Sequence, residues 1–252
     1  MATILSFGNQ KGGCGKTTTT CITAELLANK GNRILVVDLD HQGNSTFWLS
    51  QQSPYNFTGK TVYHALQERN PLPYIYKTSD YLHLLPAEDE LEEFDRETDY
   101  YILKQTLAPV MNDYDYIFLD LPPSTGIRTR NGLTASDFVV VLLQSDPLCF
   151  EALERFLRLM QTIRDDYNHS LDIAGILPTM LDPRASADRQ IIDEAREDYD
   201  DWVFTTEIKR KTRLKEFSIG GVQERYTEDR MALRPYKSFV EELLGRVTTQ
   251  KV

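Results

Sequence analysis

The sequence predicts an α/β protein with a mostly parallel, twisted sheet that helices cover on both faces. Short apolar runs rich in branched residues alternate along the chain with segments of helical periodicity. A glycine-rich turn joins the first of these runs to the first helical segment, between Phe7 and Lys16. Alternation of this kind favours parallel strands, because each crossover helix then packs on a face of the sheet.

The expected strands are continuously apolar or nearly so, as strands buried on both faces should be. In chain order they are residues 4–7, 34–38, 81–86, 117–120, 138–143, 173–177 and 203–206. Helical patterns lie between or after them in segments 16–29, 98–110, 151–165, 187–199 and 236–247. The sequence shows no internal repeat, so we expect a single domain over residues 1–252, with no helix-turn-helix domain before it.

The composition is that of an ordinary globular protein, with 41% hydrophobic and 26% charged residues among 252. A net charge of −10 argues against a generally basic nucleic-acid binder, although a local basic patch remains compatible with it. Cys14, Cys21 and Cys149 lack the spacing of metal ligands and are interpreted as reduced thiols of a cytosolic protein. The apolar runs are all shorter than the roughly 20 residues of a membrane span.

The glycine-rich turn has the residues of a phosphate-binding loop, and the alternative is a strand-to-helix turn without a ligand. Its glycines let backbone N–H groups close around phosphate oxygens. Lys16 supplies a charge for the β- and γ-phosphates, and the Thr17 hydroxyl can ligate Mg²⁺. The expected nucleotide-binding residues are Gly12, Gly13, Cys14, Gly15, Lys16, Thr17 and Thr18.

The loop departs from the common G-x-x-x-x-G-K-[ST] motif at its start. Gln10 stands at the first glycine position, and Lys11 is an additional lysine. Since Lys16 already serves the phosphates of its own loop, we expect Lys11 to act elsewhere, with a neighbouring subunit as one candidate.

Carboxylates follow two of the expected strands. Asp38 lies at the end of the strand at 34–38 and Asp40 follows two residues later, and Asp120 ends the strand at 117–120. The carboxyl ends of parallel strands face the ligand crevice. One aspartate of the first pair can support Mg²⁺ or the loop, and the other can orient an attacking water. An apolar strand that ends in aspartate, after a phosphate loop, predicts that Asp120 holds Mg²⁺ through water.

Residues 9–18 resemble the deviant Walker A box of the ParA/MinD group of ATPases, and within it the ParA (Soj) partition ATPases. The resemblance implies a P-loop NTPase fold with ATP and Mg²⁺ as cofactors. The block from Asp38 to Asn44 resembles the family's D-x-D-P-Q-G-N, which gives Asp40 the water-orienting role and places His41 where the family has proline. The D-x-P-P after the fourth strand matches at Asp120.

The last third of the chain resembles the family more loosely. Residues 175–184 resemble a segment near the nucleotide base, which includes Met180; positions 183–184 lie outside the residues that the structure describes. Residues 208–216 resemble I-P-R-N-x-R-L-x-E, with Arg210 matched and Lys209 in place of the proline that shapes the base pocket. A strand end with a proline-rich turn is the alternative interpretation of the first segment.

Residues 208–216 also form a basic patch that could bind the phosphate backbone of DNA when two copies lie side by side. The alternative is an exposed basic turn that pairs with nearby carboxylates such as Glu207 and Glu216. The candidate DNA-binding residues are Lys209, Arg210, Lys211, Arg213 and Lys215. A run of acidic residues at 88–99 is interpreted as a solvated face, with a docking surface for a basic partner as the alternative.

The resemblance implies a cytoplasmic partition ATPase that is associated with the nucleoid when it has bound ATP. ATP would create a homodimer in which Lys11 of each subunit reaches the other's phosphates. The dimer would bind DNA without sequence preference, and a ParB-type partner would stimulate hydrolysis.

Two alternatives remain. A MinD-like positioning ATPase would need a basic amphipathic helix at its end, whereas the helix at 236–247 carries Glu241 and Glu242 and is not expected to hold a membrane. A small-molecule enzyme would need a second acid or base constellation.

Overall fold

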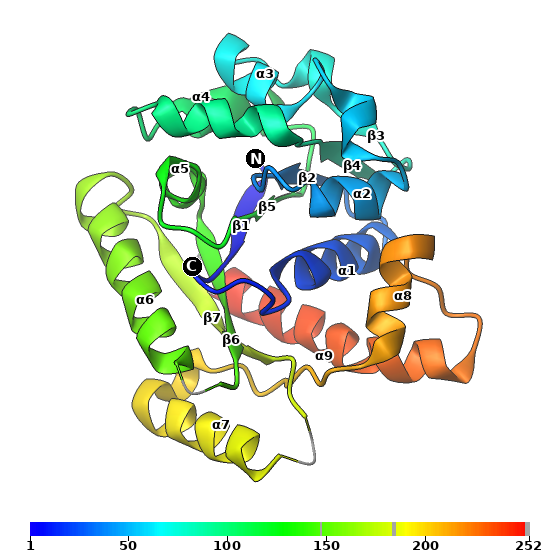
Figure 1. The fold of residues 1–252 in the computed structure, drawn as a ribbon, viewed down its shortest axis with the longest axis vertical. Coiled ribbons are helices and arrows are strands. Elements are labelled where there is room, and N and C mark those ends of the chain that lie inside the picture. The colour runs from blue at the N-terminus through cyan, green and yellow to red at the C-terminus, as the bar shows by residue number, and fades with distance from the viewer. Residues whose placement is uncertain (147, 183–184, 250–252) are drawn as a thin grey trace.

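Within residues 1–146, 148–182 and 185–249, which the computed structural model describes, seven strands form one sheet in the order β3-β4-β2-β5-β1-β6-β7 (Figure 1). Neighbouring strands are parallel except for the β3–β4 pair at one edge. The strands are β1 (Thr3–Gly8), β2 (Ile34–Asp38), β3 (Tyr76–Lys77), β4 (Leu82–Leu85), β5 (Tyr116–Asp120), β6 (Phe138–Gln144) and β7 (Asp172–Thr179). The predicted α/β fold is confirmed.

Helices cover both faces of this sheet. They are α1 (Lys16–Ala28), α2 (Asn44–Ser50), α3 (Val62–Glu68), α4 (Ile102–Leu107), α5 (Ile127–Ala135), α6 (Cys149–Asp166), α7 (Ser186–Tyr199), α8 (Thr212–Gly220) and α9 (Thr227–Thr249). Figure 1 shows α3 to α6 on one side of the sheet and α1, α8 and α9 on the other. Short 3₁₀ turns complete the connections, among them η3 (Asp89–Arg96) and η4 (Ala108–Val110).

The alternation of side chains along each strand builds two cores. Val139 and Val141 of β6 pack toward α5 and α6, whereas Val140 and Leu142 pack toward α1 and α9. Both sets are fully buried. This explains why the strand segments are continuously apolar in the sequence, since each face of the sheet lies in a core.

The strand expected at 203–206 is wrong. Val203 makes a single parallel bridge with Ile176 of β7, and no strand continues from it in the described chain. The N–H of Phe204 still donates to the Ile176 carbonyl at 2.8 Å, but the N–H groups of Thr205 and Thr206 donate to the Glu242 carboxylate of α9 at 2.8 and 3.0 Å. A helix side chain therefore satisfies the backbone groups that a strand would have offered to its neighbour.

Two helices differ in length from the expectation, and both regions contain proline. The segment 98–110 gives only α4 and then η4, since Pro109 has no N–H to continue an α-helix. The segment 236–247 is longer than expected, because α9 starts at Thr227 and contains Pro235. Pro235 cannot donate to the carbonyl four residues earlier, at Met231, and Lys211 Nζ donates to that oxygen at 2.8 Å instead.

The last described helix packs on the sheet. α9 buries an apolar stripe that includes Phe239, Val240 and Leu243, all essentially inaccessible to solvent. In the described residues no helix has both the length and the apolar character that crossing a bilayer would take. The apolar face of α9 is used within the core.

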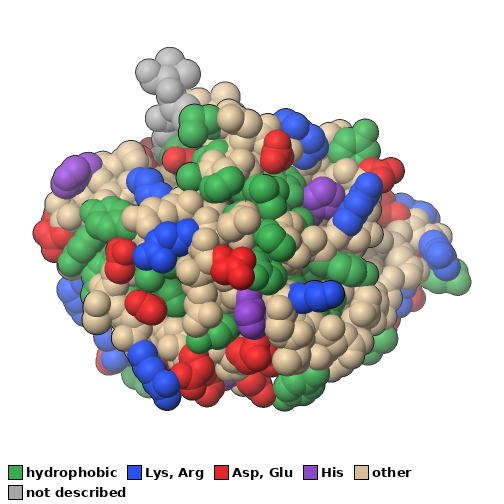
Figure 2. Space-filling view, turned by 90° about the horizontal axis from the view of Figure 1, so that it is seen from above, with side chains coloured by type: hydrophobic (Ala, Val, Ile, Leu, Met, Phe, Trp, Pro, Cys, Tyr) green, Lys and Arg blue, Asp and Glu red, His purple; other side chains and the backbone are tan. Residues whose placement is uncertain are grey.

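Charges are mixed on the side of the molecule that carries α3 and α4. Figure 2 views this side from above and shows acidic, basic and hydrophobic side chains interspersed over it. The acidic run at 88–99 falls largely within η3. This turn packs on the core through the buried side chains of Leu91 and Phe94. Whether its carboxylates also dock a partner stays a prediction.

Candidate functional site

The loop between β1 and α1 has the backbone conformation that a glycine-rich phosphate loop needs. Gly13 and Gly15 have φ angles of 78° and 88°, in the left-handed region that favours glycine. Gly15 directly precedes α1, and in the described chain no side chain caps this helix end. The first N–H groups of α1 are therefore available to an anion in front of the helix.

Lys16 occupies the position expected of a phosphate-binding lysine. Its side chain is largely buried, and Nζ donates a 2.9 Å hydrogen bond to the carbonyl oxygen of Lys11. Beneath the loop, Cys14 is buried and its carbonyl accepts a 2.7 Å hydrogen bond from Thr179 Oγ1. These contacts fix the loop against the end of β7 and hold the ammonium group inside its curve.

Lys11 has a partner within its own chain. Its ammonium group pairs with the carboxylate of Asp146, which follows β6. Both side chains are partly exposed. The reach of Lys11 to a neighbouring subunit stays a prediction, and it would require Lys11 to leave Asp146.

Asp120 lies at the centre of a cluster of hydroxyl groups at the end of β5. Its Oδ2 accepts hydrogen bonds from Thr17 Oγ1 at 2.7 Å and from Ser45 Oγ at 2.5 Å, and Oδ1 accepts one from Thr20 Oγ1 at 3.5 Å. The two expected Mg²⁺ ligands, the Thr17 hydroxyl and the Asp120 carboxylate, are thus in direct contact.

Asp38 is fully buried beside Asp120, because the two residues are register partners in the β2–β5 pair. Its Oδ2 accepts hydrogen bonds from the backbone N–H and the hydroxyl of Thr46, both at 2.8 Å. Burial, followed by the charge of Asp120, raises the pKa of Asp38 above its ordinary value, and burial raises the pKa of Asp120. Adjacent buried carboxylates with raised pKa values favour a cation nearby.

Asp40 lies at the mouth of the same crevice. Its N–H donates to Asp38 Oδ1 at 3.1 Å, and its Oδ1 accepts from the Gln42 N–H at 3.2 Å. The side chain is 14% exposed and lines the cleft described next. A carboxylate in this place is fixed by its neighbours and still accessible to water.

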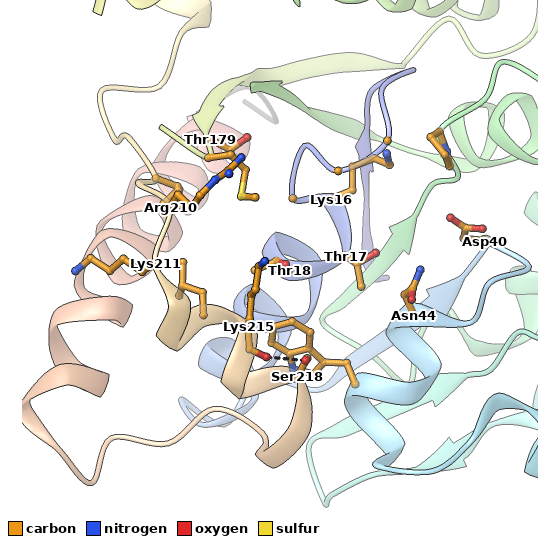
Figure 3. A pocket seen from close by; sticks show the side chains of 18 of the residues that line it. Lys16, Thr17, Thr18, Asp40, Asn44, Thr179, Arg210, Lys211, Lys215 and Ser218 are labelled. Carbon is orange, nitrogen blue, oxygen red and sulfur yellow. Dashed lines mark hydrogen bonds between the residues drawn. The ribbon is translucent and has the colours of Figure 1, made fainter. Parts of the chain in front are cut away.

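These residues border a cleft of about 600 Å³. Figure 3 shows Arg210 beside Thr179 on one side, Asp40 and Asn44 on the other, and Thr17 and Thr18 between them. The two residues expected near the base, Met180 and Arg210, both line this cleft together with Gly12 and Lys16. Met180 has a φ angle of 59°, and its side chain lies close to Gly15. The volume of the cleft and the N–H donors of the loop fit a nucleotide.

The donor set also fits Mg²⁺. In the described residues, no group of three or more His, Cys, Asp or Glu could hold a metal ion by itself. Mg²⁺ at phosphate sites commonly takes one or two protein oxygens and completes its shell with water and phosphate. Thr17 and Asp120 offer such a pair, next to the loop that faces the phosphates.

The basic segment 208–216 does not form one continuous surface in the single chain. Arg210, Lys211 and Lys215 line the nucleotide cleft, whereas Lys209 lines a separate hollow next to α7. In Figure 3 the Lys211 side chain points away from Lys16 and Thr17, toward the α9 carbonyl that accepts its hydrogen bond. Arg213 pairs with the buried carboxylate of Asp229 and with Glu216. DNA contact by these cations stays a prediction.

Sequence reasoning missed three polar residues that organise the site. Ser45 and Thr46 bond Asp120 and Asp38, and Thr179 bonds the loop carbonyl of Cys14. Ser45 and Thr46 directly follow the block at 38–44, so their position was a usable signal. Nothing local in the sequence marks Thr179, because its partner lies 165 residues away.

Comparison with known proteins agrees with this geometry. Residues 2–173 match the family model described as an AAA domain. The chromosome partitioning protein ParA of Myxococcus xanthus is 36% identical over 220 residues, which cover 84% of this chain and 77% of that protein. The chromosome-partitioning ATPase Soj of Thermus thermophilus is 35% identical over 246 residues, or 96% of each chain.

A solved structure extends the likeness to three dimensions. Cobyrinic acid a,c-diamide synthase from Mycobacterium smegmatis, with bound ATP analogue and magnesium, superposes with a TM-score of 0.83 at 31% identity. The match covers 97% of this chain and 95% of the synthase. On the identity to ParA and Soj over most of its length, this chain belongs to the ParA/Soj family of partition ATPases.

Proposed function

We propose that this protein is a Mg²⁺-dependent ATPase that partitions DNA and works as a nucleotide-dependent homodimer. The observation that carries the proposal is the cleft, in which the glycine-rich loop, Thr17 and Asp40 border one volume. The ATP analogue and magnesium named for the solved synthase support the same ligands here.

Each group in the cleft has a defined task under this proposal. Lys16 and the N–H groups of α1 hold the phosphates, and Thr17 and Asp120 hold Mg²⁺, Asp120 through water. Bound Mg²⁺ supplies positive charge to the β- and γ-phosphate oxygens. Asp40 orients the water that attacks the terminal phosphate, and Met180 and Arg210 border the side that fits the base.

Lys11→Ala is expected to leave ATP binding largely intact and to remove ATP-dependent dimerisation and hydrolysis. Lys16 already serves the phosphates of its own loop, so the additional lysine is assigned to the phosphates of the partner. Light scattering and a fluorescent ATP analogue separate the two properties. Lys60→Ala, which removes an exposed lysine elsewhere, is the control. An ATP-dependent dimer in Lys11→Ala would contradict the assignment.

DNA binding is proposed to use the lysines of the basic segment. Replacement of Lys209, Lys211 and Lys215 by glutamine is expected to weaken binding to random DNA, and ATP affinity is measured separately because Lys211 and Lys215 also line the cleft. Arg210 is kept because it is the residue expected near the base, and Arg213 is kept because it pairs with buried Asp229. Each lost phosphate contact flattens the slope of log affinity against log salt by about 0.9.

Electrophoretic shifts with ATP across a salt series measure both affinity and slope. The matched control replaces three exposed lysines elsewhere, namely Lys30, Lys60 and Lys104, by glutamine. Equal effects of the two triple variants would mean that only net charge matters, and no effect of the first would move the DNA site. A wild type that hydrolyses ATP but never retains DNA would favour the small-molecule enzyme instead.

The same dimer is proposed to respond to a ParB-type partner that stimulates hydrolysis and releases the DNA. The protein would then alternate between a cytoplasmic state and a nucleoid-associated, ATP-bound state. Liposome flotation with ATP tests the MinD-like alternative. We expect no stable membrane association, because α9 buries its apolar stripe in the core.

A further inference from the structure

His41 lies next to the carboxylate that is proposed to orient water, at the position where the resemblance places a proline. Its Nδ1 is 3.6 Å from Asp40 Oδ1, and its side chain is partly buried. A histidine here can donate a hydrogen bond to Asp40, and a proline cannot. The structure shows what prevents this donation.

Arg128 of α5 holds the His41 ring. Its Nη1 lies 3.1 Å from His41 Nδ1, within hydrogen-bonding distance. The guanidinium is immobilised on its other side, because Nε and Nη2 donate to the two carboxylate oxygens of Asp95 in η3 at 2.8 and 3.0 Å. The Arg128 side chain is only 8% exposed, so this arrangement has little freedom to rearrange.

The contact with Arg128 determines which nitrogen of the His41 ring carries the hydrogen. A guanidinium only donates hydrogen bonds, so His41 Nδ1 must accept and carries no hydrogen. The ring hydrogen is then on Nε2, which lies 3.2 Å from Glu92 Oε1 of η3. The nitrogen nearest Asp40 is therefore a lone-pair acceptor, and it cannot donate to the carboxylate.

We propose that Arg128 is a positioning residue that fixes the tautomer of His41 and so keeps the Asp40 carboxylate free to orient water. The inference rests on the proposed role of Asp40. Asp40 Oδ1 already accepts a hydrogen bond from the Gln42 N–H. A second donor, from Nδ1 of a freed His41, would compete with water for the same carboxylate and weaken its pull on the water proton.

Arg128→Leu is expected to lower kcat for ATP hydrolysis about three- to tenfold, the effect of one misplaced hydrogen bond. KM for ATP should stay unchanged, since Arg128 does not border the cleft. In a His41→Pro background, the same substitution should change kcat less than about twofold, because the competing donor is gone. A merely structural role of Arg128 would not be relieved by removing His41.

Arg130→Leu is the matched control on the same helix. Arg130 bonds the Thr125 carbonyl and stacks on Tyr100, away from His41. Thermal unfolding of all variants shows whether each one folds. Equal losses of kcat from Arg128→Leu with and without His41 would overturn the proposal.

A second readout does not depend on ATP hydrolysis. Long-range ¹H–¹⁵N correlation spectra distinguish the two tautomers of a histidine ring, and the His41 signals are assigned by their loss in His41→Pro. We expect the Nε2–H form in the wild type and its loss in Arg128→Leu. An Nδ1–H ring or an imidazolium in the wild type would overturn the proposal even if the protein hydrolyses ATP. The expected tautomer in a protein that hydrolyses no ATP would instead reject the proposed function.

Discussion

Lys16→Ala is expected to abolish ATP binding at concentrations that saturate the wild type. Lys16 is the loop lysine whose ammonium group is held inside the curve of the loop, by the Lys11 carbonyl. A hydrogen bond to a charged group contributes about 1.5–3 kcal/mol, so losing a single one lowers affinity roughly 10- to 150-fold. Because a lysine can contact both the β- and the γ-phosphate, the loss should lie at or beyond the upper end.

Titration with a fluorescent ATP analogue measures this directly. Lys30→Ala is the control, because Lys30 is an exposed lysine just beyond the far end of α1. Thermal unfolding without nucleotide should show that both variants are folded. If Lys16→Ala bound the ATP analogue as tightly as the wild type, Lys16 would not be the phosphate-binding lysine.

Asp40→Ala is expected to slow ATP hydrolysis about 10²- to 10⁴-fold and to leave ATP bound in a dimer. The range is the usual contribution of a positioned acid or base to proton transfer. Binding should persist, because Lys16, Thr17 and Asp120 keep their contacts when the Asp40 side chain is removed. Phosphate release and light scattering on the same sample test the two halves of this expectation.

The controls for Asp40 separate its chemistry from its charge. Asp80→Ala removes a carboxylate that is 85% exposed and distant in sequence, and it should hydrolyse ATP like the wild type. Asp40→Asn keeps the shape and the acceptor for the Gln42 N–H, and it should be nearly as slow as Asp40→Ala. Normal turnover in Asp40→Ala would place the water-orienting group elsewhere.

The fold was predictable where burial alone decides the local structure. The segment at 138–143 reads as a strand because both of its faces are buried, and it is the body of β6. The segment at 203–206 has a similar apolar start, yet Glu242 of a distant helix accepts the N–H groups of Thr205 and Thr206. α2, α3, α5 and α8 escaped prediction, since short helices with few buried apolar residues leave a weak periodic signal.

The site was predictable where its functional residues are consecutive in the sequence or lie at strand ends. Glycines at positive φ, Lys16 and Thr17 are consecutive, and strand ends bring Asp38 and Asp120 together by register. The partners of charged side chains were not predictable in this way. Arg213 meets buried Asp229, and Arg128 meets Asp95 and His41, because elements distant in sequence pack against each other. A basic run in the sequence therefore overstates the number of cations that DNA could reach.

Because Lys11 already pairs with Asp146, the proposed dimer would exchange one counterion of Lys11 for another, and Lys11 would not gain a first counterion on assembly. In the single chain, Asp146 already neutralises Lys11, and both side chains are partly hydrated. Part-exposed ion pairs of this kind contribute only about 0.2–1 kcal/mol. Lys11 can therefore transfer from one anion to another at small cost in either direction. Assembly through this lysine would be readily reversible, and Asp146 would receive the lysine back when the partner's phosphate is gone.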